Sequence, residues 1–128
     1  MVEGQNQSGR QSTVTKFVGG DVHLIASTDE VVDDDTPTEL DEKSQAVETT
    51  ASGDWTTSDD NSAGTTTLEN AAEIDFGAQD GYTHTQTVVE ATDGSDSLLL
   101  IPEDSENEFT GETFSYPSGS LSYTLGGE

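Results

Sequence analysis

The excess of acidic over basic side chains limits what this chain can fold into more than any other feature of its sequence. Its 128 residues include 27 Asp and Glu but only 3 Lys and Arg, which gives a formal net charge of −24. Charges of one sign repel one another on a compact surface, so this imbalance opposes folding unless the solvent screens it.

Two explanations of the charge are open. The first is intrinsic disorder, because only 29% of the residues are hydrophobic and little apolar surface is available to offset the entropy lost on folding. The second is adaptation to molar salt, in which the Debye length shrinks to about 3 Å. Acidic disordered chains generally keep Lys as an abundant polar residue, whereas Arg10, Lys16 and Lys43 are the only bases here. The apolar residues also form short clusters between turn residues. We therefore expect a folded protein of a halophilic system, with disorder of the isolated chain as the alternative.

The charge also excludes two classes of partner. A surface this negative repels phosphate backbones and anionic lipid, so we expect neither nucleic-acid binding nor membrane insertion. The longest apolar run, residues 98–101, is far shorter than a transmembrane segment, and the first residues lack the pattern of a signal peptide. We expect synthesis in the cytoplasm. Without Cys the chain has no disulfide and no thiol nucleophile.

Segments with a period of two residues predict β-strands. The clearest is the stretch in which Ala72, Ile74 and Phe76 alternate with acids before Gly77. Residues 14–18 and 21–26 predict a hairpin at Gly19-Gly20, residues 82–91 and 97–101 predict a pair, and residues 114–125 predict a hairpin at Pro117-Ser118-Gly119. Turn signals at this spacing indicate an all-β fold, either an antiparallel β-sandwich or a small jelly-roll-like barrel.

The remaining segments are more polar. Residues 1–12 predict an extended N-terminal arm, and residues 13–128 a single β domain. Residues 28–43 and 55–64 predict exposed loops, the second anchored by Trp55, and residues 37–46 contain the only helix candidate. The eight aromatic residues are too few for both a core and a binding platform, so we expect most of them in the core.

No catalytic motif is present, and we expect no enzyme activity. The two histidines, His23 and His84, each fall in a predicted strand without a ligand partner nearby in sequence, and His84 between two Thr predicts an exposed position. The sequence contains neither the nucleophile elbow of hydrolases nor a glycine-rich phosphate loop. Paired acids are expected by chance in so acidic a chain and therefore carry no information.

Two acidic loops are candidate cation sites. Their oxygens suit Ca²⁺, Mg²⁺ or Na⁺, although neither loop matches an EF-hand, and a solvated acidic loop is the simpler interpretation. The candidate ligands are Asp33, Asp34, Asp35, Asp59, Asp60 and Asn61.

The small number of hydrophobic residues favours assembly of several copies of the chain. A chain with few hydrophobic residues gains stability by burying further surface between copies, so we expect a homo-oligomer.

The order of these features resembles small virion structural proteins of tailed viruses, of the tail-fibre-like, minor tail and head-fibre kinds. The resemblance covers about residues 22–126 and lies in residues 24–29, Trp55, residues 68–77, residues 94–100 and residues 111–125. The chain departs from the pattern at Ser44-Gln45-Ala46, where the family has Tyr-Ala-Arg, and in lacking Pro after Asp29.

The resemblance implies a virion component without catalytic residues, and the acid excess then implies a tailed virus of a halophilic archaeon. Its partners would be copies of itself, other capsid or tail proteins, and a host cell-surface protein or glycan. We expect a tail-tip or fibre component, or a capsid turret or decoration. Attachment to the host surface is the role we expect for it. The alternative is a cellular halophilic module that binds carbohydrate or cations.

Overall fold

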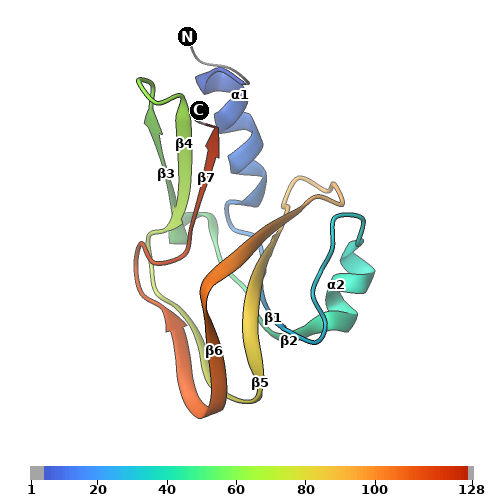
Figure 1. Ribbon diagram of the computed structural model, residues 1–128. Helices are drawn as coiled ribbons and strands as arrows, with labels where there is room; N and C mark the ends of the chain where they lie inside the picture. Colours follow the sequence, from blue (N-terminus) through green and yellow to red (C-terminus); the bar gives the residue numbers. More distant parts are fainter. Residues whose placement is uncertain (1–4, 127–128) are drawn as a thin grey trace.

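Two antiparallel sheets make up most of the computed structural model, which describes residues 5–126 (Figure 1). The four-stranded sheet has the order β2-β1-β5-β6, and the three-stranded sheet has the order β3-β4-β7. Their strands are β1 (Val22–Ala26), β2 (Ser44–Glu48), β3 (Trp55–Asp60), β4 (Thr65–Asn70), β5 (Ile74–Glu90), β6 (Leu98–Tyr116) and β7 (Ser122–Gly126). The predicted all-β class is confirmed as two sheets packed together, and neither sheet closes into a barrel.

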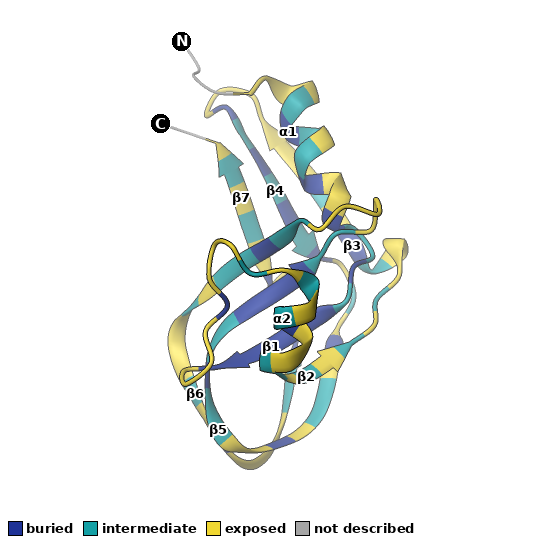
Figure 2. Cartoon of the chain, turned by 90° about the vertical axis from the view of Figure 1, so that its right-hand side faces the viewer, coloured by how far each residue is buried: buried dark blue, intermediate teal, exposed yellow. Residues whose placement is uncertain are grey.

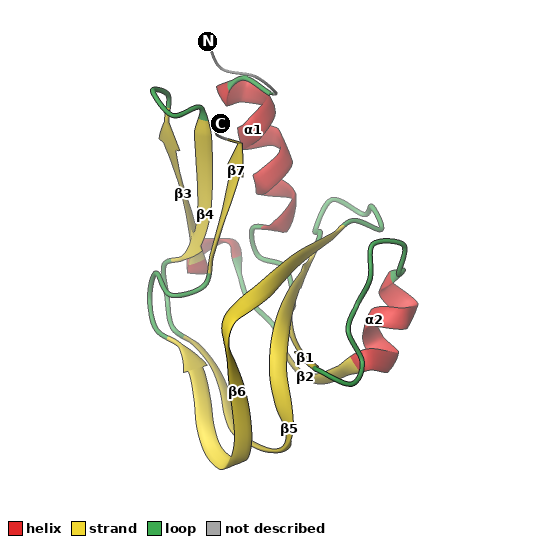
Figure 3. Ribbon diagram, viewed as in Figure 1, coloured by secondary structure: helices red, strands yellow, loops and turns green. Residues whose placement is uncertain are grey.

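Within the described residues 5–126, two α-helices and two 3₁₀ turns accompany the sheets (Figure 3). They are α1 (Gln7–Val14), α2 (Pro37–Lys43), η1 (Thr15–Phe17) and η2 (Ser52–Asp54). The predicted helix is confirmed as α2, which begins at Pro37, where proline's missing N–H costs nothing, and ends with Lys43 beside its negative pole.

The strand β1 is buried on both faces, and this places the core. Val22 and Leu24 face the main hydrophobic cluster, which also takes residues from α1, η1 and both sheets. Ile25 faces a second cluster with Val31, Leu40 and Val88. Figure 2 shows α2 lying across this second face of β1. Because side chains alternate along a strand, His23 shares the α2 side with Ile25.

The strands β5 and β6 form a long ribbon that bends sharply at the lower end of Figure 1. Four irregularities interrupt its register, and Gly77 and Gly81 within the bent part have positive φ, a conformation that favours glycine. The bend wraps around a cluster of aromatic rings made by Phe76, Tyr82, Phe109, Phe114 and Tyr116. Most aromatic residues were expected in the core: four of the eight are buried in the main cluster, and the other four are partly buried and pack against it.

The predicted N-terminal arm is wrong for the residues that the structure describes. Residues 7–14 form α1, capped by the Asn6 side chain, which accepts a 3.0 Å hydrogen bond from the Gly9 N–H. Residues 1–4 lie outside the described part. The predicted strand at residues 14–18, and the hairpin with it, are also wrong, because this segment ends α1 and forms η1. Since Val14 packs in the main core, α1 belongs to the same folded unit as the sheets.

The predicted C-terminal hairpin is also wrong. The strand β6 pairs with β5, whereas β7 pairs with β4 in the other sheet. The turn after Tyr116 therefore carries the chain between sheets. Asn70 holds this crossing: its amide donates to the backbone oxygens of Tyr116 (3.1 Å) and Pro117 (2.9 Å), and its oxygen accepts from the Leu121 N–H (2.9 Å).

Two further boundaries differ from the prediction. The segment expected as a loop anchored by Trp55 contains β3, although Trp55 itself is buried as expected. The strands predicted around Ile74 and at residues 82–91 are parts of one strand, β5, because the residues between them remain paired with β6. The predicted pairing of residues 82–91 with residues 97–101 is confirmed.

Candidate functional site

The first predicted cation loop is closed by one of the chain's own bases. Lys43 Nζ lies 2.6 Å from Asp35 Oδ2 and donates to the Glu30 carbonyl at 2.9 Å. The hydrogen bond from Lys43, followed by that from the Val32 N–H, lowers the pKa of Asp35 to about 2. Asp33 and Asp34 are exposed. Lys43 thus occupies the position at Asp35 that a bound cation would take.

The second predicted cation loop contacts α1. Asp59 accepts hydrogen bonds from Thr66 Oγ1 (2.6 Å), Gln11 (2.8 Å) and Gln7 (3.2 Å), and the first two of these are the main causes of its lowered pKa. Asp60 and Asn61 are also engaged: Asp60 accepts from the N–H groups of Ser62 and Ala63, and Asn61 Oδ1 accepts from Arg10.

Arg10 is the centre of this second contact, although it is only 3% exposed. Its guanidinium donates to Thr66 Oγ1 at 3.0 Å, to the Gln5 carbonyl at 2.9 Å and to Asn61 at 3.3 Å. The oxygens predicted as metal ligands therefore attach α1 to the three-stranded sheet. The turn between β3 and β4 lies at the top of Figure 1, and the segment that leads into α2 lies at its right-hand side, so the two loops do not form a joint site.

His84 is fully buried, and the predicted exposed position is wrong. Its Nδ1 accepts from the Asn107 amide at 3.0 Å, and its Nε2 lies 2.9 Å from Thr87 Oγ1 and 3.4 Å from Glu103 Oε1. Thr87 and Tyr116 both donate to the Glu103 carboxylate. Burial lowers the pKa of His84 and raises that of Tyr116, which keeps both groups neutral.

Thr87, His84 and Glu103 have the hydroxyl, imidazole and carboxylate of a catalytic triad, but they are not accessible to a substrate. Thr87 and His84 are both 0% exposed, and the Phe109 ring stacks on the imidazole at 5.8 Å. A substrate could not reach the hydroxyl without opening the core. The network therefore acts as a hydrogen-bonded support for the bent ribbon.

His23 forms a second polar group, at the face of β1 that α2 covers. Its side chain is 1% exposed, its Nδ1 lies 2.7 Å from Ser44 Oγ, and its Nε2 lies 2.8 Å from Glu90 Oε2. Asp41, on α2, brings a further carboxylate, so that one ligand atom from each of His23, Asp41 and Glu90 lies within 4.8 Å of the others. Two elements far from β1 in sequence, α2 and β5, thus each bring a carboxylate close to the His23 imidazole.

Ser44 Oγ has two partners within hydrogen-bond distance, His23 Nδ1 at 2.7 Å and the Leu40 carbonyl oxygen. Ser44 Oγ donates to the Leu40 carbonyl at 2.6 Å, and a carbonyl can only accept. When the single hydroxyl proton goes to Leu40, His23 Nδ1 donates to Ser44 and does not receive its proton. A general base needs the opposite direction.

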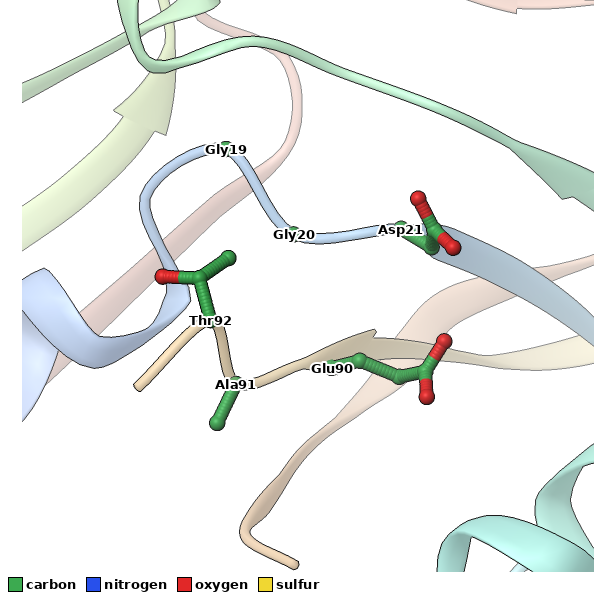
Figure 4. Close-up of a pocket in the computed structure, with 6 residues that line it drawn as sticks. All are labelled: Gly19, Gly20, Asp21, Glu90, Ala91 and Thr92. Carbon is green, nitrogen blue, oxygen red and sulfur yellow. The ribbon is translucent and has the colours of Figure 1, made fainter. Parts of the chain in front are cut away.

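A pocket of about 180 Å³ adjoins this group, since Glu90 belongs to both (Figure 4). It is lined by Gly19, Gly20, Asp21, Glu90, Ala91 and Thr92. A side chain on Gly20 would overlap the backbone oxygen of Glu90, so the close approach of these strand ends requires glycine. The pocket gives solvent a route to the Glu90 carboxylate, which is 27% exposed.

Sequence reasoning missed the His23 group because its members come from residues 23, 41 and 90 without a shared motif. The only local signal was a histidine in a strand whose five residues are all buried, and burial is not visible in the sequence.

Comparison of the chain with protein-family models, curated proteins and solved structures finds no match. The resemblance to small virion proteins therefore stays a prediction. Within residues 5–126, no helix has the length and hydropathy to cross a membrane.

Proposed function

We propose that this chain is a non-enzymatic structural subunit of a haloarchaeal virus particle, either at the tail tip or fibre or as a capsid turret or decoration, and that it assembles with copies of itself through β7. The observation that carries the proposal is the chemistry of the strand edges. Each sheet ends in strands with unpaired backbone groups, and such edges pair with other chains unless they are protected.

Acidic residues protect three of the four edges. The outer strands β2, β3 and β6 all carry Asp or Glu, and β6 carries five of them, Glu103, Asp104, Glu106, Glu108 and Glu112. Like charges placed opposite each other destabilise strand pairing, so these edges repel a second copy. The edge strand β7 contains no charged residue. It is the edge at which a chain of this charge can approach its own copy.

The non-enzymatic part of the proposal has separate support. The Thr87 hydroxyl is buried beside His84, and the Leu40 carbonyl competes with His23 for the Ser44 proton. A buried hydroxyl and one bound to a backbone carbonyl are both poor nucleophiles. An acidic subunit with an uncharged pairing edge suits a virus particle in a high-salt environment. The exposed faces of the sheets would then contact the host surface.

Matched substitutions in one row of the three-stranded sheet test the assembly. Thr56 on β3 and Ser122 on β7 both lie opposite Glu69 of β4, and both are exposed. Ser122→Glu and Thr56→Glu therefore add the same charge beside the same neighbour but on different edges. At the lowest KCl concentration that keeps the chain folded, where charges are least screened, sedimentation should show an oligomer for the unchanged chain and for Thr56→Glu, and a shift to monomer for Ser122→Glu.

The symmetry of the assembly tests whether the chain is part of a virus particle. A three-, five- or six-fold array around a shell or tube is the expected result. A free monomer that is stable in molar salt would contradict the proposal, as would equal oligomerisation of the two variants.

The second candidate, a cation-binding module of a halophilic cell, is favoured by one observation. His23, Asp41 and Glu90 bring a nitrogen and two carboxylates together at a solvent-accessible place.

A further inference from the structure

We propose that His23, Asp41 and Glu90 bind one divalent transition-metal ion of the Zn²⁺ class, which fastens α2 to the four-stranded sheet. This metal site does not depend on pairing through β7, because β7 belongs to the other sheet. The proposed site specifies which cation the chain would bind if its function is cation binding, the second candidate function.

The contacts of His23 direct its Nε2 at a carboxylate. Ser44 Oγ donates to the Leu40 carbonyl at 2.6 Å, and in that arrangement His23 Nδ1 donates to Ser44. The lone pair of Nε2 then faces Glu90 Oε2 at 2.8 Å. In this tautomer a metal ion between the two acceptors removes their mutual repulsion.

A second carboxylate makes a metal ion the better occupant. A proton joins two atoms, whereas the cluster presents three ligand atoms within 4.8 Å of one another. Bonds of about 2.0–2.2 Å from one ion to nitrogen and oxygen ligands place those ligands within this separation. An ion would also neutralise Asp41 and Glu90, which otherwise add to the repulsion within a strongly acidic chain.

The surroundings of His23 match those of a metal-binding histidine. Such a histidine donates its other ring N–H to a carbonyl, carboxylate or water, which fixes the tautomer and the ring plane. Here Ser44 takes that position and is itself fixed by the Leu40 carbonyl. The remaining ligands keep the site open, since Asp41 is exposed and Glu90 borders the pocket of Figure 4. A metal can therefore enter and retain water.

The ligand set selects the metal. An imidazole with two carboxylates suits Zn²⁺ and related first-row ions, whereas Ca²⁺ and Mg²⁺ prefer oxygen ligands alone. We therefore expect Zn²⁺ to bind in the presence of an excess of Mg²⁺. This ion differs in place and kind from the Ca²⁺, Mg²⁺ or Na⁺ expected at the acidic loops.

The test uses the full chain in molar KCl, with Zn²⁺ as the probe. The chain has two histidines, so nitrogen NMR of the imidazoles reports on His23 while His84 serves as an internal control. Zn²⁺ should shift the Nε2 resonance of His23, leave that of His84 unchanged, and bind with a stoichiometry of one per chain in calorimetry. An excess of Mg²⁺ should not reverse the shift.

Neighbouring acids on α2 give a matched pair of variants. Asp41→Asn and Glu42→Gln remove one exposed charge each from the same helix, but only Asp41 belongs to the cluster. Asp41→Asn should weaken Zn²⁺ binding roughly tenfold or more, and Glu42→Gln should not. Ser44→Ala should weaken binding roughly 10–100-fold through the loss of the orienting hydrogen bond.

Three results would overturn the metal site. The first is a His23 Nε2 resonance that Zn²⁺ leaves unchanged, since the imidazole would then bind no metal. The second is equal Zn²⁺ affinity in Asp41→Asn and Glu42→Gln, which would mean binding to acidic surface in general. The third is a Zn²⁺ shift of both histidines. None of these results bears on the β7 edge, whose test is sedimentation.

Discussion

At the scale of single residues, buried polar side chains organise this protein as much as apolar ones do. Asn70 is 0% exposed and connects the end of β6 with the start of β7, while Arg10 connects α1 with β4. A buried polar group is costly unless its partners are present, so each of these residues admits one arrangement of its neighbours.

Arg10 provides the first prediction at this scale. Arg10→Lys keeps the positive charge but cannot reach Thr66, Gln5 and Asn61 together, since the guanidinium fork is lost. We expect a loss of about 1–3 kcal/mol in the free energy of unfolding, measured by urea titration in molar salt. Lys16→Arg, at an exposed position, is the control and should leave stability unchanged. Equal stability of Arg10→Lys and the unchanged chain would show that the hydrogen bonds do not hold α1.

His84 predicts a pH dependence of stability. Burial lowers its pKa from 6.5, so below about pH 6.5 the unfolded chain binds a proton that the folded chain does not. The stability that His84 contributes is complete above that pH and is lost as the pH falls toward the lowered folded value. Urea titrations at about pH 7 and about pH 5 should show a larger acid-induced loss for the unchanged chain than for His84→Gln, since the carboxyl groups titrate in both.

A direct measurement accompanies this prediction. The Cε1 proton shift of His84 should titrate with a midpoint below 6.5, because burial lowers its pKa. A titration midpoint at or above 6.5 would contradict the buried network around Thr87 and Glu103.

At the scale of elements, glycine allows strand ends to meet where side chains would separate them. Gly20 is buried and lies against the backbone of Glu90, at the point where β1 and β5 begin to pair. This contact sets the position of β5 relative to β1, and with it the distance from Glu90 to His23.

Gly20→Ala tests this contact. The added methyl group would overlap a backbone oxygen that cannot rotate away, so we expect a loss of about 1–3 kcal/mol in unfolding free energy. Gly53→Ala is the matched control, because nothing lies within 4 Å of the added atom and its backbone does not require glycine. It should change stability by less than about 0.5 kcal/mol. If both variants unfold at the same urea concentration, the close approach is not needed.

At the scale of the whole molecule, the acidic side chains are separated from the hydrophobic core. In residues 5–126 no Asp or Glu is among the buried residues, and the Asp35 side chain, at 8% exposure, is paired with Lys43; the apolar residues form two clusters on either side of β1. The negative charge therefore lies where dissolved ions can screen it.

This separation predicts that salt stabilises the fold. Raising KCl from 0.1 M to 2 M should increase the melting temperature, because screening removes repulsion that the folded state concentrates and the unfolded chain relieves. Sucrose of equal osmolality is the control, since it is uncharged and acts only through exclusion from the surface. A melting temperature that rises equally in sucrose, or stays constant in KCl, would contradict adaptation to salt.

The sequence by itself determined the local features of this protein. Alternation around Ile74, the turn residues and the helix start at Pro37 depend on neighbours within a few positions, so the β class and α2 could be predicted. The helix α1 was missed because its buried face contains Arg10, a residue that sequence patterns assign to the surface.

Only the tertiary structure decided which strands pair and which polar groups meet. A period of two shows that residues 114–125 form strands, but it does not show that β7 joins β4 instead of β6; Asn70, 46 residues before Tyr116, makes that crossing possible. The same holds for His23, Asp41 and Glu90, which share no local pattern. Pairing and convergence are set by burial and hydrogen bonding between distant residues, and those energies exist only once the chain has folded.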